Sequence, residues 1–166
     1  MSRSLKVILF VSILANILLI ALLANQYMNS TNNNSDQNYE YTSFYETMNI
    51  VQKNYIDPSV DQNNQQVVIK ALVTAYSQFN DAKEAFNNFS IGYSGDLRVL
   101  DMQAALNEFD RHLFSVILDY INEEPNNEVL AQVNNQLKNL LTQLPQKYDG
   151  NDKKFVAQAN KAITDF

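Results

Sequence analysis

Apolar residues recur at alternating spacings of three and four from Tyr41 onward, and this pattern constrains the fold more than any other feature. The spacing places apolar side chains along one side of an α-helix, where they must be buried against neighbouring helices. No window alternates between apolar and polar residues for long enough to favour a β-strand. Five stretches carry the pattern: Tyr41, Phe44, Met48, Val51 and Tyr55; Val68, Leu72, Ala75, Phe79, Ala82, Phe86 and Phe89; Val99, Met102, Leu106, Phe109, Leu113, Val116 and Tyr120; Leu130, Val133, Leu137, Leu140 and Leu144; and Phe155, Ala159, Ile163 and Phe166.

Prolines and glycines lie between these stretches and predict where the helices end. Pro58 is expected to end the first helix at Asp57, because a residue that precedes proline is disfavoured in helical geometry. Residues 90–95 include two of the three glycines and separate the two longest stretches, and Asp96 then stands where an N-cap would be. Pro125 suits the first turn of the fourth helix.

The connections between the expected helices are short, at about six to eight residues, which is usual between antiparallel neighbours in a bundle. We therefore expect an all-α fold over residues 39–166. Its architecture would be an up-and-down bundle of four main helices plus a short C-terminal helix. A domain of roughly 125 residues is large enough to bury a single apolar core without disulfides or metals.

Residues 5–24 form a separate apolar segment in which Lys6 is the single charged side chain. A helix of that length is roughly 30 Å long and matches the hydrocarbon core of a bilayer, which predicts a transmembrane helix. Arg3 and Lys6 lie at its start, and no further basic residue occurs until Lys53. The positive-inside rule then places residues 1–4 in the cytoplasm and everything after the segment outside.

The alternative to an uncleaved signal anchor is a signal peptide that is removed, which would leave a secreted bundle. Cleavage after Ala24 would place Leu22 where a small residue is preferred, and the apolar run exceeds the usual length of a signal-peptide core. We therefore expect the anchor to be retained. Residues 25–38 are expected to be a polar, flexible tether, because residues 29–38 carry no apolar side chain that folding could bury.

Composition excludes several classes of site. The chain has no cysteine, one histidine and three glycines. It therefore cannot form a thiolate metal site, a disulfide, an HExxH zinc site or a glycine-rich phosphate loop. Ten basic and eighteen acidic residues follow Lys6, a net charge of −8. Because that charge repels phosphate backbones, we expect no nucleic-acid binding.

The densest ionisable group lies in the third stretch. Its members share one helical face at spacings of seven, four and seven residues: Asp101, Glu108, His112 and Asp119. Carboxylates beside a histidine suit a metal or proton-transfer site, but this spacing departs from the Glu-x-x-His pairs of di-iron bundles. We interpret the group as a solvated face opposite the apolar seam. We expect no catalytic, cofactor-binding or metal site.

Three tyrosines form a candidate interaction surface. Tyr39 and Tyr45 lie off the apolar seam, and Tyr93 lies in the glycine-containing break. Tyrosine is enriched at the energetic centres of protein interfaces, so rings that need not be buried are candidates for binding a partner. The alternative interpretation is partly buried rings with hydrated hydroxyls.

These observations favour a non-enzymatic, single-pass protein of a bacterial cell membrane. Lipid would surround residues 5–24, and the outer bundle would bind another envelope or membrane protein as an accessory subunit, assembly factor or inhibitor. The bacterial hypothesis rests on a composition rich in Asn, Lys and Tyr. Two alternatives stay open: a ligand-sensing ectodomain with a small-molecule pocket between helices, and a secreted bundle.

Overall fold

Every secondary-structure element that the structure describes is a helix, which confirms the all-α class for these residues. This computed structural model describes residues 19–20, 22–23, 36–93 and 97–164. The chain divides into two units, Met1–Asp36 and Gln37–Phe166. In the first unit, residues 19, 20, 22 and 23 are helical and exposed.

The predicted membrane segment falls mainly outside the described residues. The same holds for the expected cytoplasmic residues 1–4 and for residues 25–35 of the expected tether. Within the ranges that are described, no helix combines the length and the apolar character needed to cross a bilayer. Residues 36–38, which the sequence assigned to the tether, are helical. Polar residues are tolerated there because the helix is stabilised by the packing of its later turns.

The first helix of the second unit continues past Pro58, so the expected end at Asp57 was wrong. It comprises α-helical residues 37–50, the π-helical stretch η1 (Val51–Ile56) and α2 (Asp57–Val60). Pro58 lies in the first turn of α2, and the Asp57 N–H donates to the Gln52 carbonyl five residues earlier. A regular α-helix would bring the proline ring against the carbonyl four residues before it. The wider π turn relieves that clash.

The π-helical stretch also changes which side chain faces the core. The spacing predicted Tyr55, but the structure buries Ile56 completely and leaves Tyr55 half-buried. A π turn contains more residues than an α turn, so the next core position moves one residue along the chain. Gln52 is turned inward in the same stretch and is only 5% exposed.

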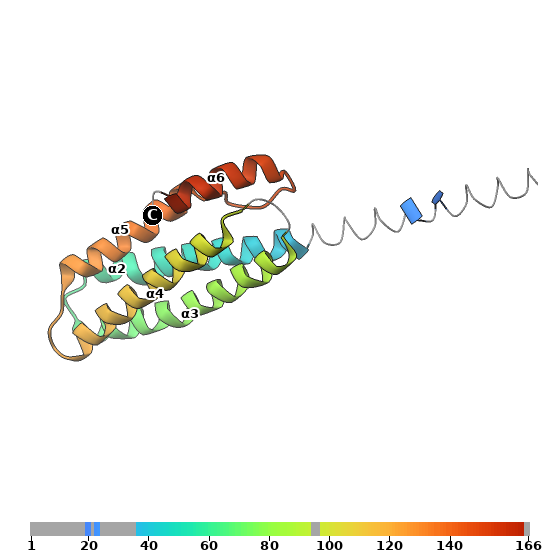
Figure 1. Cartoon of the computed structure of the whole chain (residues 1–166). Helices are drawn as coiled ribbons and strands as arrows, with labels where there is room; N and C mark the ends of the chain where they lie inside the picture. The colour runs from blue at the N-terminus through green and yellow to red at the C-terminus, as the bar shows by residue number, and fades with distance from the viewer. Residues whose placement is uncertain (1–18, 21, 24–35, 94–96, 165–166) are drawn as a thin grey trace, which may run out of the picture. The chain divides into compact units, whose positions relative to one another are not determined.

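The remaining helices are α3 (Gln65–Gly92), α4 (Val99–Ile121), α5 (Asn127–Gln143) and α6 (Asp152–Thr164). Successive helices run in opposite directions (Figure 1). The first helix packs against α3 and α5, α4 packs against the same two helices, and α6 lies against α4 and α5. The second unit is therefore a bundle of four main helices with a shorter C-terminal helix, as expected.

Two further helix boundaries differ from those expected. The fourth helix begins after Asn126, whose side-chain oxygen accepts a 3.1 Å hydrogen bond from the Val129 N–H. Because Asn126 is the N-cap, Pro125 precedes the helix rather than forming its first turn. The second boundary is at Gly92, because α3 extends that far into the expected break. Asp96, the expected N-cap of α4, lies outside the described residues.

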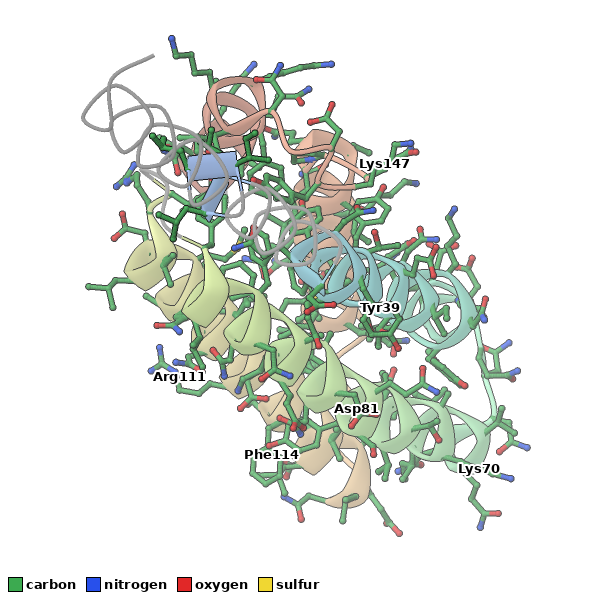
Figure 2. The ribbon with its side chains drawn as sticks, turned by 90° about the vertical axis from the view of Figure 1, so that its right-hand side faces the viewer. Tyr39, Lys70, Asp81, Arg111, Phe114 and Lys147 are labelled. Carbon is green, nitrogen blue, oxygen red and sulfur yellow. The ribbon has the colours of Figure 1, made fainter. Side chains whose placement is uncertain are left out.

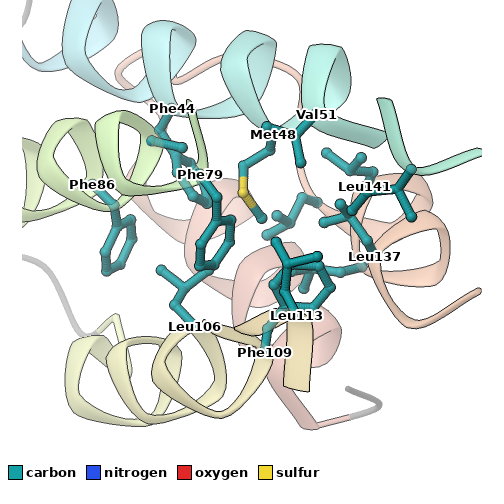
Figure 3. Packing of buried hydrophobic residues seen from close by; sticks show 14 of the residues in the cluster. Phe44, Met48, Val51, Phe79, Phe86, Leu106, Phe109, Leu113, Leu137 and Leu141 are labelled. Atoms are coloured by element: carbon teal, nitrogen blue, oxygen red, sulfur yellow. The ribbon is translucent and has the colours of Figure 1, made fainter. Parts of the chain in front are cut away.

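The apolar seams meet in one core between the helices (Figure 3). All seam residues are buried except Tyr55 and Val99, which are half-buried, and Phe166, which lies outside the described residues. The rings of Phe79 from α3 and Phe109 from α4 lie 4.8 Å apart between their centroids. Alternating spacings of three and four thus predicted the buried face of each helix, apart from the π-helical stretch.

An aromatic cluster joins α6 to the first helix and α3. Its members are Tyr41, Phe89, Tyr93, Tyr148 and Phe155. The Phe155 ring of α6 lies 4.7 Å from Tyr41 and 5.1 Å from Tyr148, in edge-on geometries that favour aromatic pairs. The Tyr41 hydroxyl also donates a 2.8 Å hydrogen bond to the Pro145 carbonyl. The connection between α5 and α6 is therefore held against the first helix.

Candidate functional site

The three tyrosines of the predicted interaction surface do not form one exposed patch. Tyr39 is 72% exposed (Figure 2). Tyr45 is half-buried, and its hydroxyl donates a 3.3 Å hydrogen bond to the Leu141 carbonyl of α5. Tyr93 is half-buried in the aromatic cluster, with its ring 5.1 Å from Phe89. Only Tyr39 presents most of its surface to solvent, so an interaction surface made of all three is not supported by their positions.

The acidic face of α4 is solvated, as the sequence predicted. Asp101, Glu108 and His112 are exposed, and Asp119 is half-buried. The first three line a hollow of about 420 Å³, where Arg98 forms an ion pair with Asp101. Within the described ranges, no group of three or more His, Asp or Glu side chains is arranged to hold a metal ion.

A larger groove runs between the first helix and the α5–α6 connection. It consists of two adjoining hollows of about 860 and about 390 Å³. The hollows share the side chains of Tyr45, Asn49, Lys53, Leu144 and Gln146. A groove of this size accommodates a peptide or a small ligand.

Four lysines, each from a different element, line this groove: Lys53, Lys138, Lys147 and Lys154. All four are exposed, and Lys147 extends from the α5–α6 connection at the surface (Figure 2). The lining carboxylates are Glu46 and Asp149. Among the described residues, ion pairs join Lys83 to Asp110 and Arg98 to Asp101, so none of the groove lysines has a carboxylate partner there. The groove is locally basic in an acidic chain.

Amide side chains provide most of the remaining polar lining. Asn49, Gln146 and Gln158 line the larger hollow, and none of their side chains makes a hydrogen bond to any part of the chain that the structure describes. Each amide offers donors and an acceptor. Together with the lysines, these groups can bind an anionic or peptide-like ligand. The lining side chains of the two hollows offer hydrogen bonds and positive charge to a ligand.

A buried polar network lies behind the smaller hollow and fixes α5 against the first helix. The Gln52 amide donates a 3.1 Å hydrogen bond to the Asn134 side-chain oxygen of α5. The Asn134 amide in turn donates a 2.8 Å hydrogen bond to an Asp57 carboxylate oxygen. Gln52 and Asn134 are 5% and 7% exposed, so the buried Gln52 amide depends on Asn134 as its hydrogen-bond partner. The network joins the first helix to α5, which lines the smaller hollow with Lys138, Leu141 and Thr142.

The sequence did not reveal this groove. Its lysines occur at positions between 53 and 154, and each is an ordinary surface residue in its own helix or loop. Gln52 follows the seam residue Val51, and nothing in the spacing indicates that its amide is buried. Of the three tyrosines predicted to form an interaction surface, only Tyr45 belongs to the lining.

Comparison with known proteins adds no assignment. No family model matches the chain, and searches of curated proteins and of solved structures likewise find no significant match.

Proposed function

We propose that this chain is a membrane-anchored, non-enzymatic binding protein whose helical bundle recognises another envelope or membrane protein. The groove between the first helix and the α5–α6 connection carries the proposal. It is the largest of the hollows described above, and its lysines and amides have no carboxylate or hydrogen-bond partners among the residues that the structure describes. Such groups are available to a polar partner, which can replace their hydrogen bonds to water with hydrogen bonds and ion pairs across an interface.

The aromatic cluster and the buried network support this proposal by making the groove rigid. Tyr41 holds Pro145 through its hydroxyl, and Gln52 holds Asn134 through its amide. These two hydrogen bonds tie the α5–α6 connection and α5 to the first helix. A preformed surface loses less conformational entropy on binding than a surface that must become ordered.

The membrane anchor is supported by the sequence of residues 5–24 alone. An anchored domain outside the cytoplasmic membrane would meet its partner in two dimensions, at a raised effective concentration. This setting suits an accessory subunit, an assembly factor or an inhibitor. We propose a location at the outer face of the cell membrane on the same basis.

Site-specific photocrosslinking in cells tests the proposed function. A photoreactive amino acid replaces Gln146, an exposed residue of the groove, in the full-length protein. We expect a discrete adduct with one envelope or membrane protein. The control places the same group at Ser77, an exposed residue of α3 away from the groove, and should give no such adduct. A small molecule retained by the purified protein, without any protein adduct, would instead support a ligand-sensing ectodomain.

A further inference from the structure

We propose that the groove receives an extended, acidic segment of the partner protein. This inference rests on the proposed function and names the chemistry that the partner must present. It follows from the charge of the lining, from the hydrogen-bonding groups beside it and from the length of the groove along the first helix.

The charge of the lining selects an acidic ligand. Four lysines and two carboxylates face the groove, whereas the chain after Lys6 has a net charge of −8. A basic groove in an acidic protein attracts carboxylates locally, while the rest of the surface repels large polyanions. Nucleic acid and anionic membranes present phosphate over a wide area, so the net negative charge of the chain disfavours both.

The amides of the lining favour an extended backbone over a helical one. Asn49, Gln146 and Gln158 each present donors and an acceptor beside the lysines. An extended peptide exposes its own N–H and C=O groups, which such amides can pair. A helix has already paired nearly all of its backbone groups internally, so these amides would have no backbone groups to bind.

The length of the groove fits a short segment. The first helix contributes lining residues at regular intervals along one face: Asn38, Thr42, Tyr45, Asn49 and Lys53. These fifteen residue steps span about 22 Å at the rise of an α-helix. An extended strand covers that distance with about six or seven residues. Alternate side chains of such a segment point the same way, so acidic residues at alternate positions would face the lysines.

Peptide binding to the full-length protein tests the inference. The probe is a fluorescein-labelled peptide of about twelve residues that alternates glutamate and serine, and binding to the detergent-purified protein is followed by anisotropy. We expect saturable binding that weakens at about 0.5 M salt, because charges at an exposed surface are screened. The matched peptide with glutamine in place of glutamate should bind at least about tenfold more weakly.

Variants locate the binding to the groove. The triple substitution Lys53→Gln, Lys147→Gln and Lys154→Gln should weaken binding of the acidic peptide by about tenfold, because each exposed charge contributes modestly. All three lysines are exposed, so the fold should be retained, with an unchanged circular dichroism spectrum.

A second triple variant has the same change of net charge outside the groove. It combines Lys70→Gln with Lys153→Gln and Lys161→Gln, at three exposed lysines that do not line either hollow. Lys153 is directly next to Lys154 in α6, so this control separates position from overall charge. The acidic peptide should bind this variant within about twofold of the wild-type affinity.

Four results would overturn the inference. If both triple variants weaken binding of the acidic peptide equally, the peptide is attracted by the overall charge of the protein. If the two peptides bind with equal affinity, the groove does not recognise carboxylates. Tighter groove-dependent binding of a single-stranded oligonucleotide or of phosphatidylserine vesicles would show that phosphate is the preferred ligand. An adduct at Gln146 without peptide binding would support the proposed function and contradict only the inference that the partner presents an acidic segment. The absence of any adduct would contradict the proposed function itself.

Discussion

Two tyrosine hydroxyls hold the α5–α6 connection that forms one wall of the groove. Tyr41 donates to the Pro145 carbonyl at 2.8 Å, and Tyr148 donates to an Asp152 carboxylate oxygen at 2.6 Å. Burial raises the pKa of Tyr41 well above its usual range, with a smaller contribution from Tyr45. Burial also raises the pKa of Tyr148, followed by the hydrogen bond and negative charge of Asp152. Both hydroxyls are therefore kept protonated in the folded chain.

Alkaline pH should destabilise the bundle for this reason. Unfolded tyrosines ionise at about pH 10, so above that pH the unfolded chain loses protons that the folded chain keeps. The contribution of the two protonated hydroxyls to the free energy of unfolding is fully present below that pH. It is lost as the pH rises, and the free energy of unfolding falls by at most about 1.4 kcal/mol per pH unit for each hydroxyl. Urea unfolding between about pH 8 and pH 11 measures the slope. Tyr148→Phe should reduce it, and an unreduced slope would show that Tyr148 does not carry this effect.

Phe86 tests the packing of the core at a single residue. The side chain is 1% exposed, and its ring lies 5.2 Å from that of Phe44. Phe86→Ala should lower the free energy of unfolding by about 3–5 kcal/mol, because it removes buried surface and leaves a cavity. Urea unfolding followed by tyrosine fluorescence measures this, since the chain has no tryptophan. Ile91→Ala, at a position 85% exposed on the same helix, should change it by less than about 0.5 kcal/mol. A similar loss for both variants would contradict the core assignment.

At the scale of elements, the π-helical stretch allows one continuous helix to hold both Pro58 and the buried Gln52. It moves the core position from Tyr55 to Ile56 and lets the helix continue into α2. The turn that admits the proline is therefore the turn that brings Gln52 to Asn134. Such stretches recur at functional sites in helical proteins, and here the stretch lies beside the groove.

A double-mutant cycle measures what the buried amide pair contributes. Asn134→Ala leaves the Gln52 amide buried without its partner and should cost about 1–3 kcal/mol of unfolding free energy. Replacing both residues with leucine removes both polar groups, so the double variant should cost clearly less than the sum of Gln52→Leu and Asn134→Leu. Urea unfolding of the four proteins gives the coupling. Additive costs would show that the two amides do not depend on each other.

At the scale of the whole molecule, charge is unevenly distributed between the groove and the rest of the surface. The four groove lysines come from the first helix, α5, the α5–α6 connection and α6, and only the antiparallel packing of these elements brings them together. The acidic residues of α4 lie on another face. One surface is thereby suited to an acidic ligand although the chain as a whole is acidic.

The anchor prediction also concerns the whole molecule. Full-length protein should stay in membranes through a carbonate wash, with the bundle open to protease added outside. Leu14→Arg with Leu18→Arg should leave the protein in the soluble fraction, because each central arginine costs about 2.5–3.5 kcal/mol on insertion. The control pair Leu14→Ala and Leu18→Ala should remain in membranes. A mature N-terminus near Asn25, found on protein from the medium, would instead establish a secreted bundle.

The sequence by itself determined the all-α class, the buried face of each helix and the approximate breaks between helices. These depend on local spacing, because apolar residues at intervals of three and four share one side of a helix wherever it packs. The π-helical stretch escaped prediction because its wider turn changes that periodicity within a few residues. The spacing then placed Tyr55 rather than Ile56 in the core.

Only the tertiary structure decided which polar side chains meet. The Gln52–Asn134 pair joins residues 82 positions apart, and the Tyr41 hydroxyl reaches a carbonyl 104 positions away. Local spacing says nothing about such pairs, because they depend on how far one helix is shifted along its neighbour. The groove has the same origin: each lysine is an ordinary solvated side chain in its own element, and packing alone turns the four into a basic surface.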